Sequence, residues 1–153
     1  MQLKKRTPCV GICSTTYGDL VCRGCKRFSR EIIEWVGYNE EQKQAIDARL
    51  SYLLSQLVSA RFEIFDEVKL LAGLKAQNIR FHEYRDPYCW IFELLRAGAS
   101  QVVPENYGFS VKPAYVGLPL VKQVEEIDQD FYTLSEAHFQ RYIAEPLKSI
   151  DHG

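Results

Sequence analysis

Helical periodicity dominates the middle and the end of the chain. Apolar residues recur at helical spacing from Ile46 to Val58, and Asn39 ahead of them is a favourable N-cap. This spacing predicts one amphipathic helix of about 20 residues. A second run begins near Val121, and Pro146 is expected to end it. The apolar face of this second run comprises Val124, Ile127, Phe131, Leu134, His138 and Tyr142. Both runs predict that the chain folds mainly as helices.

Two shorter helices are predicted from their capping residues. Ser29 is the expected N-cap of a helix that Gly37 ends. Pro87 suits the first position of another helix, which Gly98 closes. Both segments place apolar side chains at helical spacing, so each has a face to bury.

The segments around these helices are less regular. A helical pattern continues from Phe62 toward Gln77, but apolar and polar residues alternate in Phe62–Ile64 and Ile79–His82, so short strands are also possible there. Residues 98–120 contain several glycines and prolines, which argue against long regular elements. We therefore expect a mainly α fold with a few short strands.

The beginning of the chain is different, because it carries four of the five cysteines within residues 9–25. Their spacing is C-x3-C, eight residues, then C-x2-C. Each pair can turn two thiolates toward one ion, and two such turns joined by a hairpin form a tetrahedral sulfur cage. Gly24 is expected to permit the tight turn of the second pair, where backbone N–H groups can hydrogen-bond to the sulfurs. The candidate metal ligands are Cys9, Cys13, Cys22 and Cys25.

This cysteine-rich segment has too few apolar residues for a core of its own, so the metal must supply folding energy. We expect two domains: a four-cysteine metal ribbon with a short helix at residues 7–37, and a helical domain at residues 38–153. Trp35 is expected to pack near the ribbon, which lacks other large apolar cover.

One metal centre is expected as the cofactor. Four sulfur ligands suit Zn²⁺ or an iron–sulfur cluster, and the spacing and hairpin are closer to a zinc ribbon, which favours zinc. A closed four-cysteine site leaves no coordination position for a catalytic water. The sequence also lacks a glycine-rich phosphate loop and paired catalytic carboxylates. These features favour a non-enzymatic binding or adaptor protein, with an iron–sulfur electron carrier or redox sensor as the alternative.

The fifth cysteine, Cys89, lies among apolar neighbours and reads as a small core residue. The competing interpretation is a nucleophile with His82 as its base, but nothing in the sequence supplies a third, orienting group. His138 lies on an apolar helix face, where core packing is the expected role.

The near-neutral net charge of −1 conceals an asymmetry. Residues 1–30 carry seven basic side chains and one acidic side chain, a net charge of +6, and the remaining residues carry −7. The basic cluster comprises Lys4, Lys5, Arg6, Arg23, Lys26, Arg27 and Arg30. Metal-coupled folding is expected to bring these residues onto one surface, which predicts nucleic acid or an acidic protein surface as the partner. The alternative is that the basic cluster is attracted to the acidic residues 31–153 of the same chain.

The N-terminal residues include basic side chains but no apolar run typical of a signal peptide, and no stretch is long enough to span a bilayer. We therefore expect a cytoplasmic protein without membrane contact. Thiols stay reduced in that compartment, which favours metal ligation over disulfides.

The cysteine segment also resembles a known family. The residues that carry the resemblance are Thr7-Pro8-Cys9-Val10-Gly11-Ile12-Cys13, Cys22-Arg23-Gly24-Cys25, Arg27, Glu31-Ile32 and Trp35. With them, residues 7–50 look like the bacterial domain-of-unknown-function 1289 family (YdhL type), whose members are catalogued as predicted iron–sulfur proteins. The rest of the chain looks like the C-terminal extension of longer members. Phe28 stands where the family more often has threonine, which bears on helix entry. The resemblance implies no activity.

Overall fold

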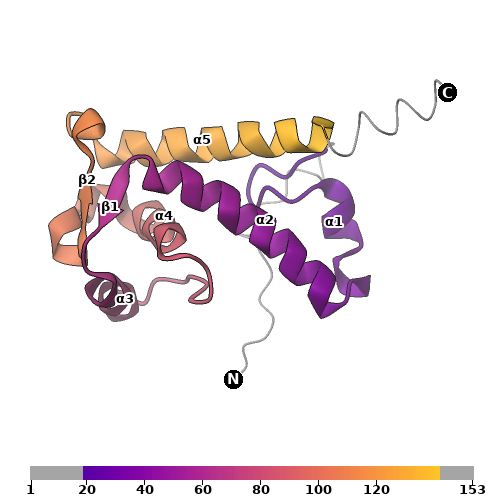
Figure 1. Ribbon diagram of the computed structural model, residues 1–153, viewed down its shortest axis with the longest axis horizontal. Helices are drawn as coiled ribbons and strands as arrows, with labels where there is room; N and C mark the ends of the chain where they lie inside the picture. Colours follow the sequence, from indigo (N-terminus) through magenta and orange to yellow (C-terminus); the bar gives the residue numbers. More distant parts are fainter. Residues whose placement is uncertain (1–18, 142–153) are drawn as a thin grey trace. The chain divides into compact units, whose positions relative to one another are not determined.

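The computed structural model describes residues 19–141 of the 153-residue chain, and these residues are mainly helical, as predicted (Figure 1). The elements, in chain order, are α1 (Ser29–Ile33), the 3-10 turn η2 (Trp35–Gly37), α2 (Glu40–Ser59), β1 (Phe62–Ile64), α3 (Glu67–Ala76), α4 (Pro87–Gly98), η3 (Ala99–Gln101), η4 (Pro104–Tyr107), β2 (Phe109–Val111), η5 (Pro113–Tyr115) and α5 (Leu120–Phe139). None of the helices within these residues combines the length and apolar character that crossing a membrane requires.

The chain divides into two compact units. Unit 1 comprises Met1–Leu50 and Asp130–Gly153, and unit 2 comprises Ser51–Gln129. The expected domain boundary between residues 37 and 38 therefore falls inside unit 1. Unit 1 joins distant parts of the sequence because side chains before α1 share a small apolar core with the last turns of α5.

The start and length of α2 agree with the sequence prediction. The Gln42 backbone N–H donates to Asn39 Oδ1 at 2.8 Å, and the Asn39 N–H donates to Gln42 Oε1 at 2.9 Å. This reciprocal cap satisfies two backbone donors at the helix start. The helix then runs for 20 residues, Glu40–Ser59.

The start of α1 differs from the prediction. Ser29 is the first helical residue, and Phe28 occupies the N-cap position. Phenylalanine has no side-chain acceptor for a cap, and instead the Phe28 N–H donates to Glu31 Oε1 at 2.8 Å. The segment still ends at Gly37, as expected, although its last turn is the separate 3-10 turn η2.

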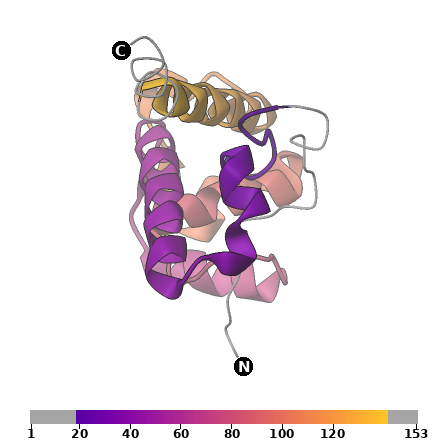
Figure 2. The ribbon, with the colours of Figure 1, turned by 90° about the vertical axis from the view of Figure 1, so that its right-hand side faces the viewer.

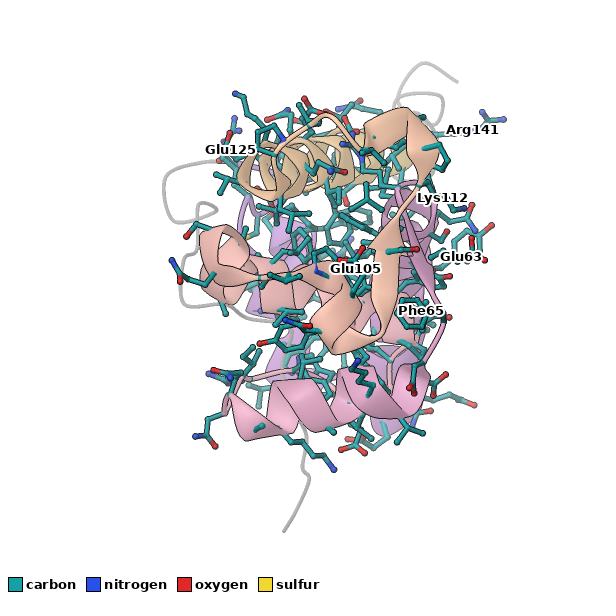
Figure 3. The ribbon with its side chains drawn as sticks, turned by 90° about the vertical axis from the view of Figure 1, so that its left-hand side faces the viewer. Glu63, Phe65, Glu105, Lys112, Glu125 and Arg141 are labelled. Carbon is teal, nitrogen blue, oxygen red and sulfur yellow. The ribbon has the colours of Figure 1, made fainter. Side chains whose placement is uncertain are left out.

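Unit 2 contains a two-stranded antiparallel sheet, which Figure 3 shows beside the labelled Glu63, Phe65 and Lys112. Its register pairs Phe62 with Val111, Glu63 with Ser110 and Ile64 with Phe109. The short strand that the sequence allowed at residues 62–64 is therefore present. Residues Ile79–His82, where the sequence allowed another strand, do not form one. Within 98–120, β2 is three residues long, too short for its pattern to stand out among the surrounding turns.

The core of unit 2 forms between this sheet and helices α3 and α4. The rings of Phe62 and Phe109 meet edge to face, with centroids 5.6 Å apart, and both side chains are fully buried. Leu70 and Leu74 of α3 are also fully buried. Asp66 caps α3 by accepting from the Lys69 N–H, and this fixes the helix directly after β1.

Candidate metal centre

The second cysteine pair lies on a tight turn just before α1, in the loop that Figure 2 shows in front of that helix. Val21 and Phe28 pair across the turn as an isolated antiparallel bridge. Inside this bridge, the Cys22 N–H donates to the Arg27 carbonyl at 2.9 Å, and the Lys26 N–H donates to the Cys22 carbonyl at 2.9 Å. These bonds hold both thiols in the interior, with Cys22 1% and Cys25 7% exposed.

The left-handed residue of this turn is Lys26, with φ of 68°. Gly24, which is expected to permit this turn, is not among the described residues with positive φ, whereas Gly108 is. The backbone reverses one residue after the second cysteine, at the point where the Lys26 N–H closes onto Cys22.

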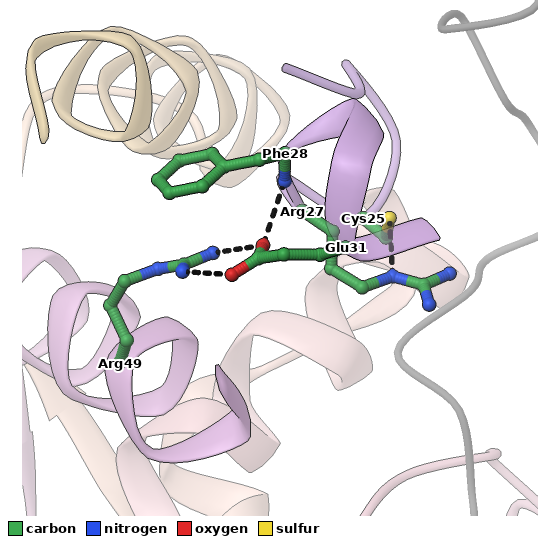
Figure 4. Close-up of polar contacts among 5 residues, drawn as sticks. All are labelled: Cys25, Arg27, Phe28, Glu31 and Arg49. Carbon is green, nitrogen blue, oxygen red and sulfur yellow. Dashed lines mark hydrogen bonds and ion pairs between the residues drawn. The ribbon is translucent and has the colours of Figure 1, made fainter. Parts of the chain in front are cut away.

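Two groups of Arg27 hydrogen-bond to the Cys25 sulfur. Arg27 Nε donates to Cys25 Sγ at 3.2 Å (Figure 4), and the Arg27 backbone N–H also bonds this sulfur. Burial raises the pKa of the Cys25 thiol, and the contacts with Arg27 oppose that rise. A charged donor on a buried sulfur favours the thiolate, which is the form that binds metal. The turn therefore fits a metal-bound cysteine pair.

Trp35 lies against the same arginine. The Arg27 guanidinium stands 4.8 Å from the centroid of the Trp35 ring, within the range of a cation–π contact. The predicted packing of Trp35 near the cysteine turn is thus confirmed, and Arg27 makes the contact. Lys43 of α2 also lies near this ring, 5.5 Å from the Trp35 centroid.

A second network, which the sequence did not reveal, fastens α1 to α2. Arg49 binds Glu31 with both terminal nitrogens, at 2.6 and 2.9 Å (Figure 4). The same Glu31 carboxylate accepts from the Phe28 N–H, and the Arg49 guanidinium lies 4.1 Å from the Phe28 ring centroid. Glu31 and Arg49 stand 18 positions apart, so local spacing gives no signal of the pair.

The end of α5 covers the turn from another side. Val21, Phe28 and Tyr132 form a buried apolar cluster, and Phe139 packs against it. The Phe28 and Phe139 rings meet edge to face, with centroids 5.1 Å apart. The centroid of the His138 ring is 6.3 Å from that of the Phe28 ring, in the packing role expected of it.

Two of the four described members of the basic cluster are buried. Lys26 is 1% and Arg27 4% exposed, so their side chains do not face solvent in this structure, and a role in partner binding stays a prediction. Their charges point inward, Arg27 toward Cys25 and Lys26 toward the turn. Arg23 and Arg30 remain exposed, and they pair with Asp19 and Glu34 respectively. Lys4, Lys5 and Arg6 lie outside the described residues.

Cys9 and Cys13 also lie outside the described residues, so the complete four-cysteine cage stays a prediction. Within residues 19–141, no three His, Cys, Asp or Glu side chains gather closely enough to hold a metal ion. A centre built on Cys22 and Cys25 thus needs ligands from beyond this range, where the sequence places the other cysteine pair.

Cys89 occupies the core of unit 2, as expected. It is 2% exposed, and its thiol donates to the Ser51 carbonyl at 3.4 Å. His82 instead holds Trp90, whose indole N–H donates to the His82 carbonyl at 3.2 Å. The contacts of Cys89 are those of a packed core thiol, and the nucleophile interpretation gains no support from them.

Comparison with protein families finds a match over the segment that contains the cysteine pairs. Residues 7–53 match the family described as a protein of unknown function, DUF1289. The chain carries a DUF1289 domain. This domain covers both cysteine pairs, α1 and most of α2, and it ends three residues beyond the first part of unit 1. No curated protein and no solved structure matches the chain.

Proposed function

We propose that the protein binds one metal ion through Cys9, Cys13, Cys22 and Cys25, and that this centre holds the DUF1289 domain in its folded shape. The observation that carries the proposal is the Cys22–Cys25 turn, in which two thiols are buried and a buried guanidinium donates to one sulfur at 3.2 Å. Zn²⁺ is the favoured ion, because the ligand spacing suits a zinc ribbon.

The charges around the turn support this assignment. Buried cations are costly unless an opposite charge accompanies them. Both Lys26 and Arg27 are buried in this turn, and Arg27 donates to a sulfur. Four thiolates on a divalent ion carry a net charge of −2, which two neighbouring cations offset.

The proposed role is structural and non-enzymatic. The apolar cluster of Val21, Phe28 and Tyr132 is small, so folding of the cysteine segment needs the additional free energy of metal binding. A closed four-sulfur site offers no coordination position to a substrate or a water. We propose a binding or adaptor protein that works in the reducing cytoplasm, where the thiols remain available to the metal.

Nucleic acid is the proposed partner, and Arg23 and Arg30 are the described members of the basic cluster with exposed side chains. Arg23 and Arg30 have side chains 61% and 76% exposed, and their ion pairs with Asp19 and Glu34 are of the weak surface kind. Backbone phosphates can displace such partners at low salt. A titration of RNA and duplex DNA at about 50 mM salt tests the proposal. Weaker binding by Arg23→Gln and Arg30→Gln supports it, and no binding by the wild type leaves an acidic protein partner.

The metal proposal is tested by anaerobic purification and metal analysis. One metal per chain is expected, and each of the four Cys→Ser changes should release it. Cys89→Ser is the matched control, because that thiol is buried in the other unit and should leave metal content unchanged. Visible absorption identifies an iron–sulfur cluster. If a cluster is present, the zinc assignment is wrong and the alternative function, an electron carrier or redox sensor, takes its place. A wild-type protein without metal would overturn the proposal.

A further inference from the structure

Lys26 combines two unfavourable features that rarely occur in one lysine. Its backbone is left-handed, with φ of 68°, a conformation in which a Cβ is sterically disfavoured. Its side chain is also buried, at 1% exposed, which is uncommon for lysine. The other non-glycine residue with positive φ in the described part of the chain is Asn78, a residue type that tolerates this region.

The ammonium group of Lys26 folds back over its own turn. Nζ donates to the Arg23 carbonyl at 2.6 Å and to the Gly24 carbonyl at 3.1 Å. It also lies 5.3 Å from the centroid of the Phe131 ring of α5. The two carbonyls belong to the residues between Cys22 and Cys25, so the ammonium holds the peptide groups that separate the two thiols.

We propose that Lys26 is a positioning residue of the metal centre, whose buried ammonium fixes the Cys22–Cys25 turn and offsets the negative charge of the metal-bound thiolates. This inference rests on the four-cysteine centre proposed above. Holding the two carbonyls orients the peptide planes of the turn, and with them the N–H groups on the cysteine side. The positive charge lies within the same turn as the thiolates, in a buried setting where screening by solvent is weak.

Three substitutions separate the contributions of the ammonium and of the backbone. Lys26→Met keeps an apolar stem and removes the charge and the donors. Lys26→Gly removes the whole side chain but relieves the left-handed backbone. Lys26→Arg keeps a cation that can donate to the carbonyls. Lys43→Met is the matched control, because Lys43 also lies over an aromatic ring of unit 1, at 5.5 Å from Trp35, and is placed in α2 away from the turn.

The measurement is the affinity of each metal-free protein for Zn²⁺ and for Co²⁺, determined against a chromophoric chelator. We expect Lys26→Met and Lys26→Gly to bind both ions about 10–100-fold more weakly than the wild type, the loss typical of groups that support metal ligands. Lys26→Arg should recover most of the affinity, and Lys43→Met should match the wild type. The Co²⁺ spectrum should keep its thiolate charge-transfer bands throughout, because the ligands themselves are unchanged.

The outcomes separate this inference from the proposed function. If the wild type binds metal and Lys26→Met binds it equally well, Lys26 is not a positioning residue, although the centre stands. If Lys26→Gly binds metal as tightly as the wild type, the backbone conformation at position 26 matters and the side chain does not, which would overturn the inference. Failure of Lys26→Arg to recover affinity would overturn the part played by the charge. A wild type that binds no metal would overturn both proposals.

Discussion

At the scale of single residues, Glu31 and Arg49 form a mostly buried ion pair that fastens α1 to α2. Their side chains are 12% and 15% exposed, and two hydrogen bonds join them. We predict that Arg49→Met lowers the free energy of unfolding by about 2–4 kcal/mol, because it leaves a mostly buried carboxylate without its counter-charge. Urea unfolding of the full chain, followed by circular dichroism, measures the change.

The chain offers a matched control for this prediction. Arg30 and Glu34 form an ion pair at 3.1 Å whose side chains are 76% and 47% exposed. Arg30→Met should cost less than about 1 kcal/mol, since exposed ion pairs contribute little. Equal losses for Arg30→Met and Arg49→Met would show that burial of the Glu31–Arg49 pair does not matter to stability.

His138 gives the domain a dependence on pH. Its pKa lies below the ordinary value of a histidine because burial disfavours the imidazolium, and the nearby Arg49 adds to the effect while Glu31 opposes it. A lowered pKa means that the folded protein prefers neutral His138. The associated stability is therefore present above the ordinary pKa of about 6.5 and is lost as the pH falls through the lower pKa of the folded state.

We accordingly predict that His138→Gln weakens the fall in stability below about pH 6.5. The melting temperatures of the wild type and the variant are measured from neutral to mildly acidic pH. Their difference at each pH is the quantity to follow, because the titration of the other groups affects both proteins equally and cancels. Parallel curves would contradict the prediction, as would a wild type that gains stability on acidification relative to the variant.

At the scale of elements, the last turns of α5 pack against the cysteine turn and share an apolar cluster with it. The rings of Phe139 and Phe28 have centroids 5.1 Å apart, and Phe28 is the N-cap of α1, three residues after Cys25. We predict that Phe139→Ala lowers stability by about 1–3 kcal/mol, through lost apolar burial and the lost ring contact. It should also weaken metal binding, because folding of the turn and binding of the metal are coupled.

Leu134→Ala is the control for this helix, because Leu134 is 39% exposed on α5 and has less apolar contact to lose. Chelator competition and thermal unfolding of both variants test the coupling. If Phe139→Ala unfolds earlier but binds metal as tightly as the wild type, the end of α5 and the centre are independent.

Local patterns predicted the elements well where capping chemistry is local. The Asn39 cap, the 20-residue α2 and the start of α4 at Pro87 follow from residues within one turn of each other. The cysteine spacing likewise indicated candidate ligands. The three-residue β2 escaped prediction because its partner β1 stands more than 40 positions earlier in the chain.

At the scale of the whole molecule, the division into units could not be predicted from contiguous patterns. The sequence suggested a break after residue 37, whereas the end of α5 belongs with the first 50 residues. Apolar periodicity shows that a helix has a face to bury but not which distant side chains will cover it. Burial of charge is equally hard to predict: the sequence gives no sign that Lys26 and Arg27 are buried, because their burial depends on the turn that surrounds them.

The central claim is that one ion is held by the sulfurs of Cys9, Cys13, Cys22 and Cys25. X-ray absorption at the edge of the bound metal measures the ligand atoms directly. For zinc, the account predicts four sulfur neighbours at about 2.3 Å and no second metal scatterer. A shell dominated by nitrogen or oxygen, fewer than four sulfurs, or an unchanged shell after Cys22→Ser would contradict it.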